Sequence, residues 1–144
     1  MSLKKEPLLT FSRFNLRRVE RSIRKNLTPD LLPKKWVALN EKNTMFGHCH
    51  TASGVLYEIF RSENVHMYRT YDDSCKLVDE EMYHWFILNR HTDEIIDITA
   101  LQYANHPRLL KKLYKTKLKS SILGFGYRKR VHTLLDRVRM ELKF

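Results

Sequence analysis

The chain has 144 residues, of which 42% are hydrophobic and 11% aromatic; this composition is typical of a folded domain and excludes a disordered chain. No apolar run approaches the roughly 20 residues needed to cross a bilayer, so we expect no membrane partner. Two cysteines are too few for a secreted disulfide scaffold, and residues 1–7 lack the long apolar run of a signal peptide. We therefore predict one cytoplasmic domain over residues 1–144 with both thiols reduced.

The net charge of +11 is distributed unevenly along the chain. Residues 1–35 carry +7, residues 36–107 carry −6 and residues 108–144 carry +10. This pattern predicts a basic helical N-terminal extension, an acidic core and a basic helical C-terminal segment. The basic flanks are either solvated helix faces or a surface for nucleic acid or an acidic protein. No RNA- or DNA-binding motif accompanies the charge, so both interpretations stay open.

In the first half of the chain, the apolar periodicity predicts helices. Apolar residues at steps of three and four indicate an amphipathic helix over residues 14–27. Thr28 as N-cap and Pro29 at the first helical position predict a short helix that includes Trp36, followed by a polar loop over residues 40–47. Residues 49–60 are then expected to form a largely buried helix, although Gly54 inside it costs about 1 kcal/mol relative to alanine.

Strand patterns follow this central helix. Alternating residues predict strands over residues 64–71, 82–89 and 94–99, with an acidic turn over residues 72–81. Residues 101–113 are expected to be partly helical with a break at Pro107, and residues 115–126 to be a basic loop. Residues 127–142 predict a closing amphipathic helix. This order of elements indicates an α+β fold.

Three residues on these elements have the chemistry of a thiol hydrolase. Cys49 begins the central helix, whose positive end favours a thiolate. His84 and Asp97 lie on the two strands of a predicted hairpin, and the alternation puts them on one face within side-chain reach. A thiolate, an imidazole that exchanges its proton and a carboxylate that orients the ring make a catalytic triad.

Each of these residues also has a structural explanation when taken singly. Cys49 alone would be a small buried hydrophobe, and His84 alone a half-buried strand histidine. Asp97 is less easily explained, because a carboxylate between Ile96 and Ile98 needs a partner. Their combination on these elements favours an active site.

Acyl chemistry also needs an oxyanion hole, for which the backbone N–H of Cys49 is one expected donor. The side chain of Asn43 or His48 is the candidate second donor, although Asn43 is equally typical of a turn. Three further residues are candidates for lining a pocket: His50, Trp85 and Gln102. Trp85 is most simply explained as a core residue, and Gln102 as part of a packed helix start.

A metal site is the weakest interpretation of the cysteine region. His48, Cys49 and His50 are contiguous, whereas zinc ligands are usually more widely spaced in the sequence. Cys75 and His91 would have to complete the ligand set. We therefore predict neither a metal nor a cofactor.

Residues 27–140 resemble a known group of proteins. Small uncharacterised bacteriophage proteins share the run G-H-C-Y-x-A-S-E-A-L-Y, which resembles Gly47-His48-Cys49-His50-Thr51-Ala52-Ser53-Gly54-Val55-Leu56-Tyr57. Their His-Trp-Phe strand and Ile-x-Asp-x-Thr-x-x-Gln-Phe segment correspond to residues 84–86 and 95–103. His50 stands where the family has tyrosine, and Gly54 where it has glutamate. The chain is also similar to YunG-like bacterial proteins.

This resemblance implies a fold and a cellular location. Both groups are similar to NlpC-type and transglutaminase-type thiol proteins, so the resemblance implies a papain-like thiol-hydrolase fold. In that fold the cysteine helix packs on a small antiparallel sheet that carries the histidine and the aspartate. Residues 36–107 would then be the catalytic-like core, and a phage-encoded protein would act in the host cytoplasm.

The sequence thus predicts a cysteine hydrolase or acyl transferase that acts on an amide bond. Its substrate would be a protein or a small amide, and its activity that of a peptidase, amidase or deamidase with Cys49, His84 and Asp97 as the triad. The alternative is a non-catalytic basic protein that binds nucleic acid or a host protein on a degenerate thiol-hydrolase scaffold.

Overall fold

A computed structural model describes residues 6–45, 47–61, 65–70, 84–115, 118–119 and 127–144. The predicted acidic turn over residues 72–81, which includes Cys75, lies outside the described residues. The helices are α1 (Arg13–Asn26), α2 (Val37–Lys42), α3 (Cys49–Phe60), α4 (Pro107–Lys115) and α5 (Tyr127–Leu142). The strands are β1 (Val65–Thr70), β2 (His84–Asn89), β3 (Glu94–Ile96) and β4 (Leu118–Lys119).

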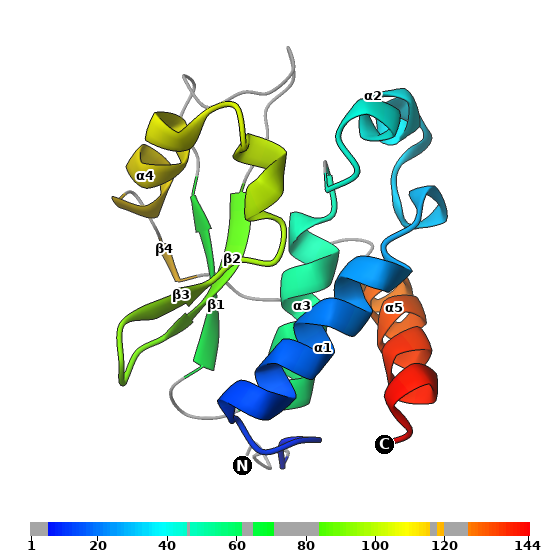
Figure 1. The fold of residues 1–144 in the computed structure, drawn as a ribbon, viewed down its shortest axis with the longest axis vertical. Coiled ribbons are helices and arrows are strands. Elements are labelled where there is room, and N and C mark those ends of the chain that lie inside the picture. Colours follow the sequence, from blue (N-terminus) through cyan, green and yellow to red (C-terminus); the bar gives the residue numbers. More distant parts are fainter. Residues whose placement is uncertain (1–5, 46, 62–64, 71–83, 116–117, 120–126) are drawn as a thin grey trace.

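The strands form one antiparallel sheet in the order β3-β2-β1-β4. Figure 1 shows α1, α3 and α5 on one side of this sheet and α4 on the other. β2 is central and pairs with β1 along its whole length, from Val65 opposite Asn89 to Thr70 opposite His84. The predicted α+β class is therefore confirmed, with helices on both faces of a small antiparallel sheet.

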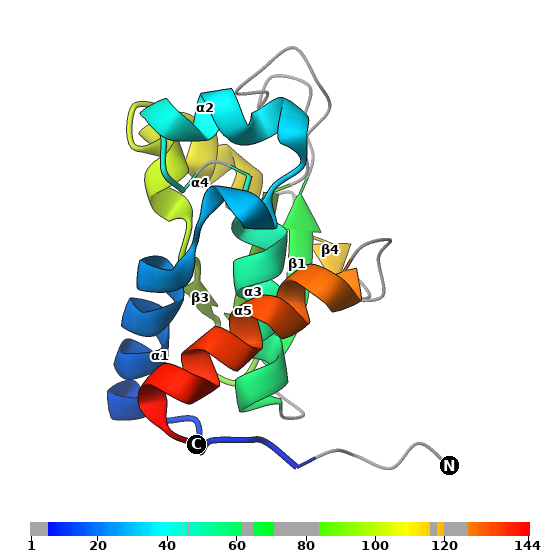
Figure 2. The same cartoon turned by 90° about the vertical axis from the view of Figure 1, so that its right-hand side faces the viewer.

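The main core lies between the sheet and the three helices that cover it. α3 is at its centre, because nine of its 12 residues are buried. α1 and α5 pack across α3 through their apolar faces (Figure 2), which contribute Leu16, Val19, Ile23, Val131, Leu134, Leu135 and Val138. The two basic terminal segments thus bury apolar stripes against the central helix, and burial of such stripes stabilises amphipathic helices more than their intrinsic propensity does.

The opposite face of the sheet carries a second, smaller apolar cluster. Tyr68, Phe86 and Leu88 form this cluster, and Ile95 and Tyr114 pack against it. Tyr114 comes from α4, so this cluster docks α4 on the sheet. Because side chains alternate along a strand, His84 belongs to the same face of β2 as Phe86 and Leu88.

The helices at the two ends and in the middle match the sequence pattern closely. The structure begins α3 at Cys49 and ends α5 at Leu142, as predicted, and places α1 one residue earlier than expected. Ser12 explains that earlier start, because its side chain accepts a hydrogen bond from the Asn15 backbone at 3.1 Å and caps α1.

Prolines divide two of the predicted helical segments, one of them unexpectedly. The short helix expected after Thr28 is divided into 3-10 turns η1 (Pro29–Leu31) and η2 (Lys34–Trp36), followed by α2, because Pro33 cannot continue a helix. The predicted polar loop over residues 40–47 consequently begins only after Lys42. The expected break at Pro107 is present, since η4 (Ala100–Tyr103) ends before it and Pro107 begins α4.

Candidate functional site

A glycine turn brings the cysteine to the N-terminus of α3. Gly47 has φ of +81°, a conformation that side-chain-bearing residues rarely adopt. A Cβ atom at this position would lie 2.9 Å from Cδ2 of Leu32 and 2.9 Å from Cε3 of Trp36. Glycine is therefore required both by the backbone turn and by the close packing of η2. The turn places His48 as N-cap and Cys49 as the first residue of α3, with Cys49 5% exposed.

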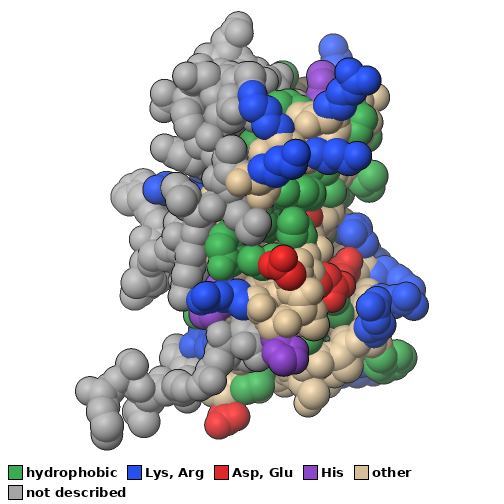
Figure 3. All heavy atoms as spheres, turned by 90° about the vertical axis from the view of Figure 1, so that its left-hand side faces the viewer, with side chains coloured by type: hydrophobic (Ala, Val, Ile, Leu, Met, Phe, Trp, Pro, Cys, Tyr) green, Lys and Arg blue, Asp and Glu red, His purple; other side chains and the backbone are tan. Residues whose placement is uncertain are grey.

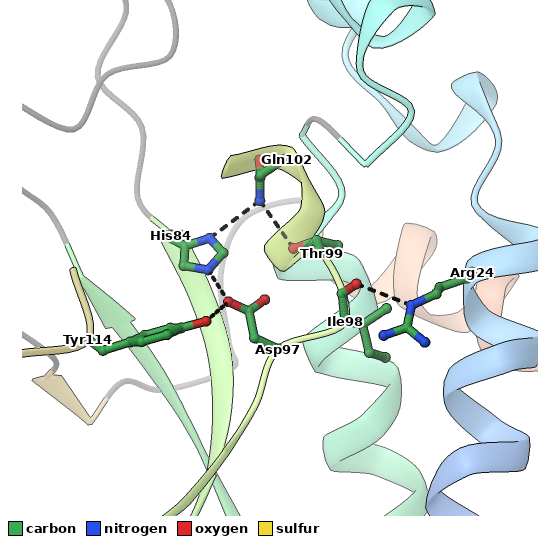
Figure 4. Close-up of polar contacts among 7 residues, drawn as sticks. All are labelled: Arg24, His84, Asp97, Ile98, Thr99, Gln102 and Tyr114. Atoms are coloured by element: carbon green, nitrogen blue, oxygen red, sulfur yellow. Dashed lines mark hydrogen bonds and ion pairs between the residues drawn. The ribbon is translucent and has the colours of Figure 1, made fainter. Parts of the chain in front are cut away.

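His84 and Asp97 form a buried pair beside that helix end. Nε2 of His84 lies 2.6 Å from Oδ2 of Asp97, and the two side chains are 0% and 4% exposed (Figure 4). Asp97 follows β3 rather than lying within it, because β3 ends at Ile96 and the predicted strand to Thr99 is three residues too long. The register that pairs Ile87 with Ile96, continued by one residue, still puts Asp97 on the face of His84.

The neighbours of His84 determine its protonation. Burial alone would lower the pKa of the imidazole, but hydrogen bonds with Asp97 and with Cys49, together with the negative charge of Asp97, raise it to about 9. The ring is therefore protonated at neutral pH. Asp97 is bound to one ring nitrogen of His84, and Cys49 is hydrogen-bonded to the same imidazole. The catalytic role of these three residues stays a prediction.

Two residues that the sequence analysis missed hold Asp97 in place. The hydroxyl of Tyr114 donates to Oδ2 of Asp97 at 2.7 Å, and burial followed by the negative charge of Asp97 raises the pKa of Tyr114. Arg24 of α1 donates from Nε to the backbone carbonyl of Ile98 at 3.4 Å. The only sequence signal for Tyr114 is its place on the apolar face of α4, next to the buried Leu113.

Gln102, a predicted pocket residue, lies directly against the imidazole. Its Nε2 is 3.4 Å from Nδ1 of His84 and donates to Oγ1 of Thr99 at 3.1 Å (Figure 4). Its Oε1 is buried and has no hydrogen-bond partner within the described part of the chain. The amide of Gln102 therefore lies near Nδ1, the ring nitrogen that Asp97 does not contact.

The two candidate oxyanion residues have different surroundings. Nδ2 of Asn43 donates to the backbone carbonyl of Gln102 at 2.9 Å, which ties the segment after α2 to η4. His48 is 0% exposed, and among the described residues neither of its ring nitrogens has a hydrogen-bond partner. Burial lowers the pKa of His48 to about 4, so its ring is neutral. Both residues precede Cys49 in the sequence, and their role in an oxyanion hole stays a prediction.

His50 and Trp85 contact one another on the α3 side of the sheet. Their rings meet edge to face with centroids 4.6 Å apart. Burial, followed by the positive charge of Arg130, lowers the pKa of His50 to about 4. His50 is thus a neutral aromatic residue that packs against β2.

Among the residues that the structure describes, no cluster of three or more His, Cys, Asp or Glu side chains is arranged to hold a metal ion. Within the same residues, every helix is too short or too polar to span a membrane. No protein-family model, curated protein or solved structure matches the chain. The function therefore has to be argued from the geometry of this site.

A basic surface lies on the exposed side of α4. Figure 3 shows lysine and arginine side chains gathered on the part of the molecule that α4 forms. The helix contains no acidic residue, and its exposed cations are Arg108, Lys111, Lys112 and Lys115. The positive charges that α4 contributes to the basic C-terminal segment therefore lie on one exposed face of this helix.

Proposed function

We propose that this protein is a cysteine hydrolase or acyl transferase that acts on an amide bond through a papain-like Cys-His-Asp triad. The observation that carries the proposal is that one buried imidazole, His84, contacts both Cys49 and Asp97. A buried cation needs a compensating charge, and the carboxylate at 2.6 Å supplies it. A buried, charged imidazole beside a thiol at a helix N-terminus is the arrangement that stabilises a thiolate.

The reaction would proceed in two stages with one proton carried by His84. The Cys49 thiolate attacks the amide carbon, a C–S bond forms, and backbone N–H groups at the start of α3 stabilise the oxyanion. His84 gives its proton to the amide nitrogen as the C–N bond breaks, which leaves a thioester. Water or an acceptor amine then attacks the thioester carbon, His84 removes its proton, and the Cys49 thiolate departs. Asp97 stays ionised and keeps the ring oriented.

The experiment that tests this proposal is alkylation with iodoacetamide, because the thiolate is the reacting form. The modification of Cys49 and Cys75 is followed by mass spectrometry between pH 5.5 and 9. We expect Cys49 at pH 6 to react about tenfold faster in the native protein than in a His84→Ala variant. The Cys49→Ala variant measures the background from Cys75. Equal rates in the native protein and the His84→Ala variant across the pH range would reject the triad.

A second candidate function is supported by the charge of α4. The exposed cations Arg108 and Lys111 lie on a helix without acidic residues, which favours binding of a polyanion such as nucleic acid. Fluorescence anisotropy with single- and double-stranded nucleic acid at 50–300 mM salt measures this binding. We expect affinity to fall steeply with salt, and to fall further in Lys111→Glu but not in Lys129→Glu, an exposed position on α5. Absence of binding at the lowest salt excludes this function.

A further inference from the structure

A pocket of about 450 Å³ is lined in part by Gln102, whose side chain contacts the imidazole of His84. One wall comes from α2 and the segment that follows it, including Lys42, Asn43 and Met45. The other wall comes from η4 and the turn before α4, including Gln102 and His106. Figure 1 shows these two parts of the chain near the end of α3 that begins at Cys49.

One contact joins this pocket to His84, and a second joins its two walls. Gln102 belongs to the pocket wall, and its side chain lies 3.4 Å from Nδ1 of His84. Asn43 donates to the Gln102 carbonyl at 2.9 Å, so the two walls are bonded to one another. The wall segment that contains Asn43 leads through the Gly47 turn to Cys49. A group bound in the pocket would therefore lie against Gln102, the residue whose side chain contacts His84.

The lining of the pocket has the chemistry of a carboxylate site. None of the described residues that line it is an aspartate or glutamate, whereas Lys42 supplies a positive charge. Asn43 and Asn105 supply amide groups, and the Asn43 amide has one N–H left after its bond to the Gln102 carbonyl. Leu101 is 65% exposed and lies in the lining as an apolar surface for a short stem. A lysine together with neutral amide donors is an arrangement that binds an anion by charge-assisted hydrogen bonds.

We propose that this pocket binds a carboxylate of the substrate, next to the amide that Cys49 attacks, and so makes the protein selective for acidic peptides. The inference rests on the proposed thiol activity. A glutamate side chain and the free C-terminus of a peptide present the same carboxylate, so the test contains an arm for each source.

Binding without chemistry is measured by calorimetry on the Cys49→Ala variant. Three of the probes are peptides with both ends blocked that have glutamate, glutamine or lysine at one position and are otherwise identical. The fourth is the glutamine peptide with a free C-terminus in place of the amidated one. We expect the peptide with the recognised carboxylate to bind about tenfold more tightly than the neutral peptide. The arm that shows this preference identifies the source of the carboxylate.

Charge reversal at the pocket distinguishes a specific site from general attraction to a basic protein. Adding Lys42→Glu to the Cys49→Ala protein should abolish the preference for the acidic peptide. The matched Lys129→Glu change reverses an exposed lysine on α5, outside the pocket, and should leave the preference in place. Thermal unfolding of both variants checks that they are folded. Equal affinity for all peptides, or a preference that survives Lys42→Glu, overturns the inference.

The same peptides carrying a chloroacetyl group separate this inference from the proposed activity. With the native protein, we expect Cys49 to be alkylated about tenfold faster by the acidic probe than by the neutral probe. Fast alkylation of Cys49 by all probes, without a preference for the acidic one, would reject carboxylate binding in the pocket but would leave the proposed thiol chemistry supported. An acidic preference in binding without any alkylation of Cys49 retains the pocket and rejects the proposed activity.

Discussion

Replacing Asp97 by asparagine is expected to slow the alkylation of Cys49 by iodoacetamide about tenfold or more at pH 6. Asparagine has the shape of aspartate but no charge, so burial of His84, which lowers the pKa of the ring, would no longer be offset by the pair at 2.6 Å. The imidazole would then be neutral, and no cation would stabilise the thiolate. For an amide substrate we expect turnover to fall on the order of 10³–10⁴-fold, the loss that follows when a triad carboxylate is neutralised.

Two matched variants show whether such a loss comes from this carboxylate. Glu94→Gln neutralises an exposed carboxylate at the start of β3 and should leave the alkylation rate unchanged. Tyr114→Phe removes the hydroxyl that donates to Asp97 but keeps the ion pair. We therefore expect a smaller decrease in the alkylation rate than in Asp97→Asn, and a loss of about 1 kcal/mol in the free energy of unfolding. An Asp97→Asn protein that alkylates as fast as the native one would show that the carboxylate does not control the thiol.

The main elements were predictable because local periodicity determines which faces are buried. Helix α3 is apolar on most of its surface, and its beginning at Cys49 follows from the polar turn before it. The placement of His84 beside Asp97 follows from strand alternation alone, since an even position faces an odd one across the hairpin. That parity holds even though β3 is shorter than its pattern predicts.

The second layer of the site was not predictable from the sequence. Tyr114 reaches Asp97 only because α4 docks on the outer face of the sheet, and that docking depends on a cluster drawn from β1, β2, β3 and α4. Arg24 reaches the Ile98 carbonyl across 74 positions in the chain. Such contacts are set by tertiary packing, which leaves no local pattern in the residues involved.

The pKa of His84 predicts that the folded protein loses stability above neutral pH. Its folded value of about 9 exceeds the ordinary 6.5, so its contribution is fully present below pH 6.5 and disappears as the pH rises through 9. The full contribution is on the order of 3 kcal/mol of unfolding free energy. Urea denaturation between pH 6 and 10 measures it. We expect the Asp97→Asn protein to lack this decline, and an equal decline in both proteins would assign it to other groups.

The pKa of His48 is shifted in the opposite direction to that of His84, so it predicts a loss of stability at acid pH. Its folded pKa of about 4 lies below 6.5, so its stabilising contribution is present above pH 6.5 and is lost as the pH falls towards 4. Burial is the cause, because protonation would place a charge in a site where, among the described residues, neither ring nitrogen is hydrogen-bonded.

A His48→Leu variant removes this titration, so we expect its urea midpoint of unfolding to change less with pH between pH 4 and 7 than that of the native protein. At neutral pH the variant should be as stable as the native protein or slightly more so, because leucine leaves no unsatisfied polar atom. An acid limb as steep as that of the native protein would show that His48 is not buried as a neutral ring.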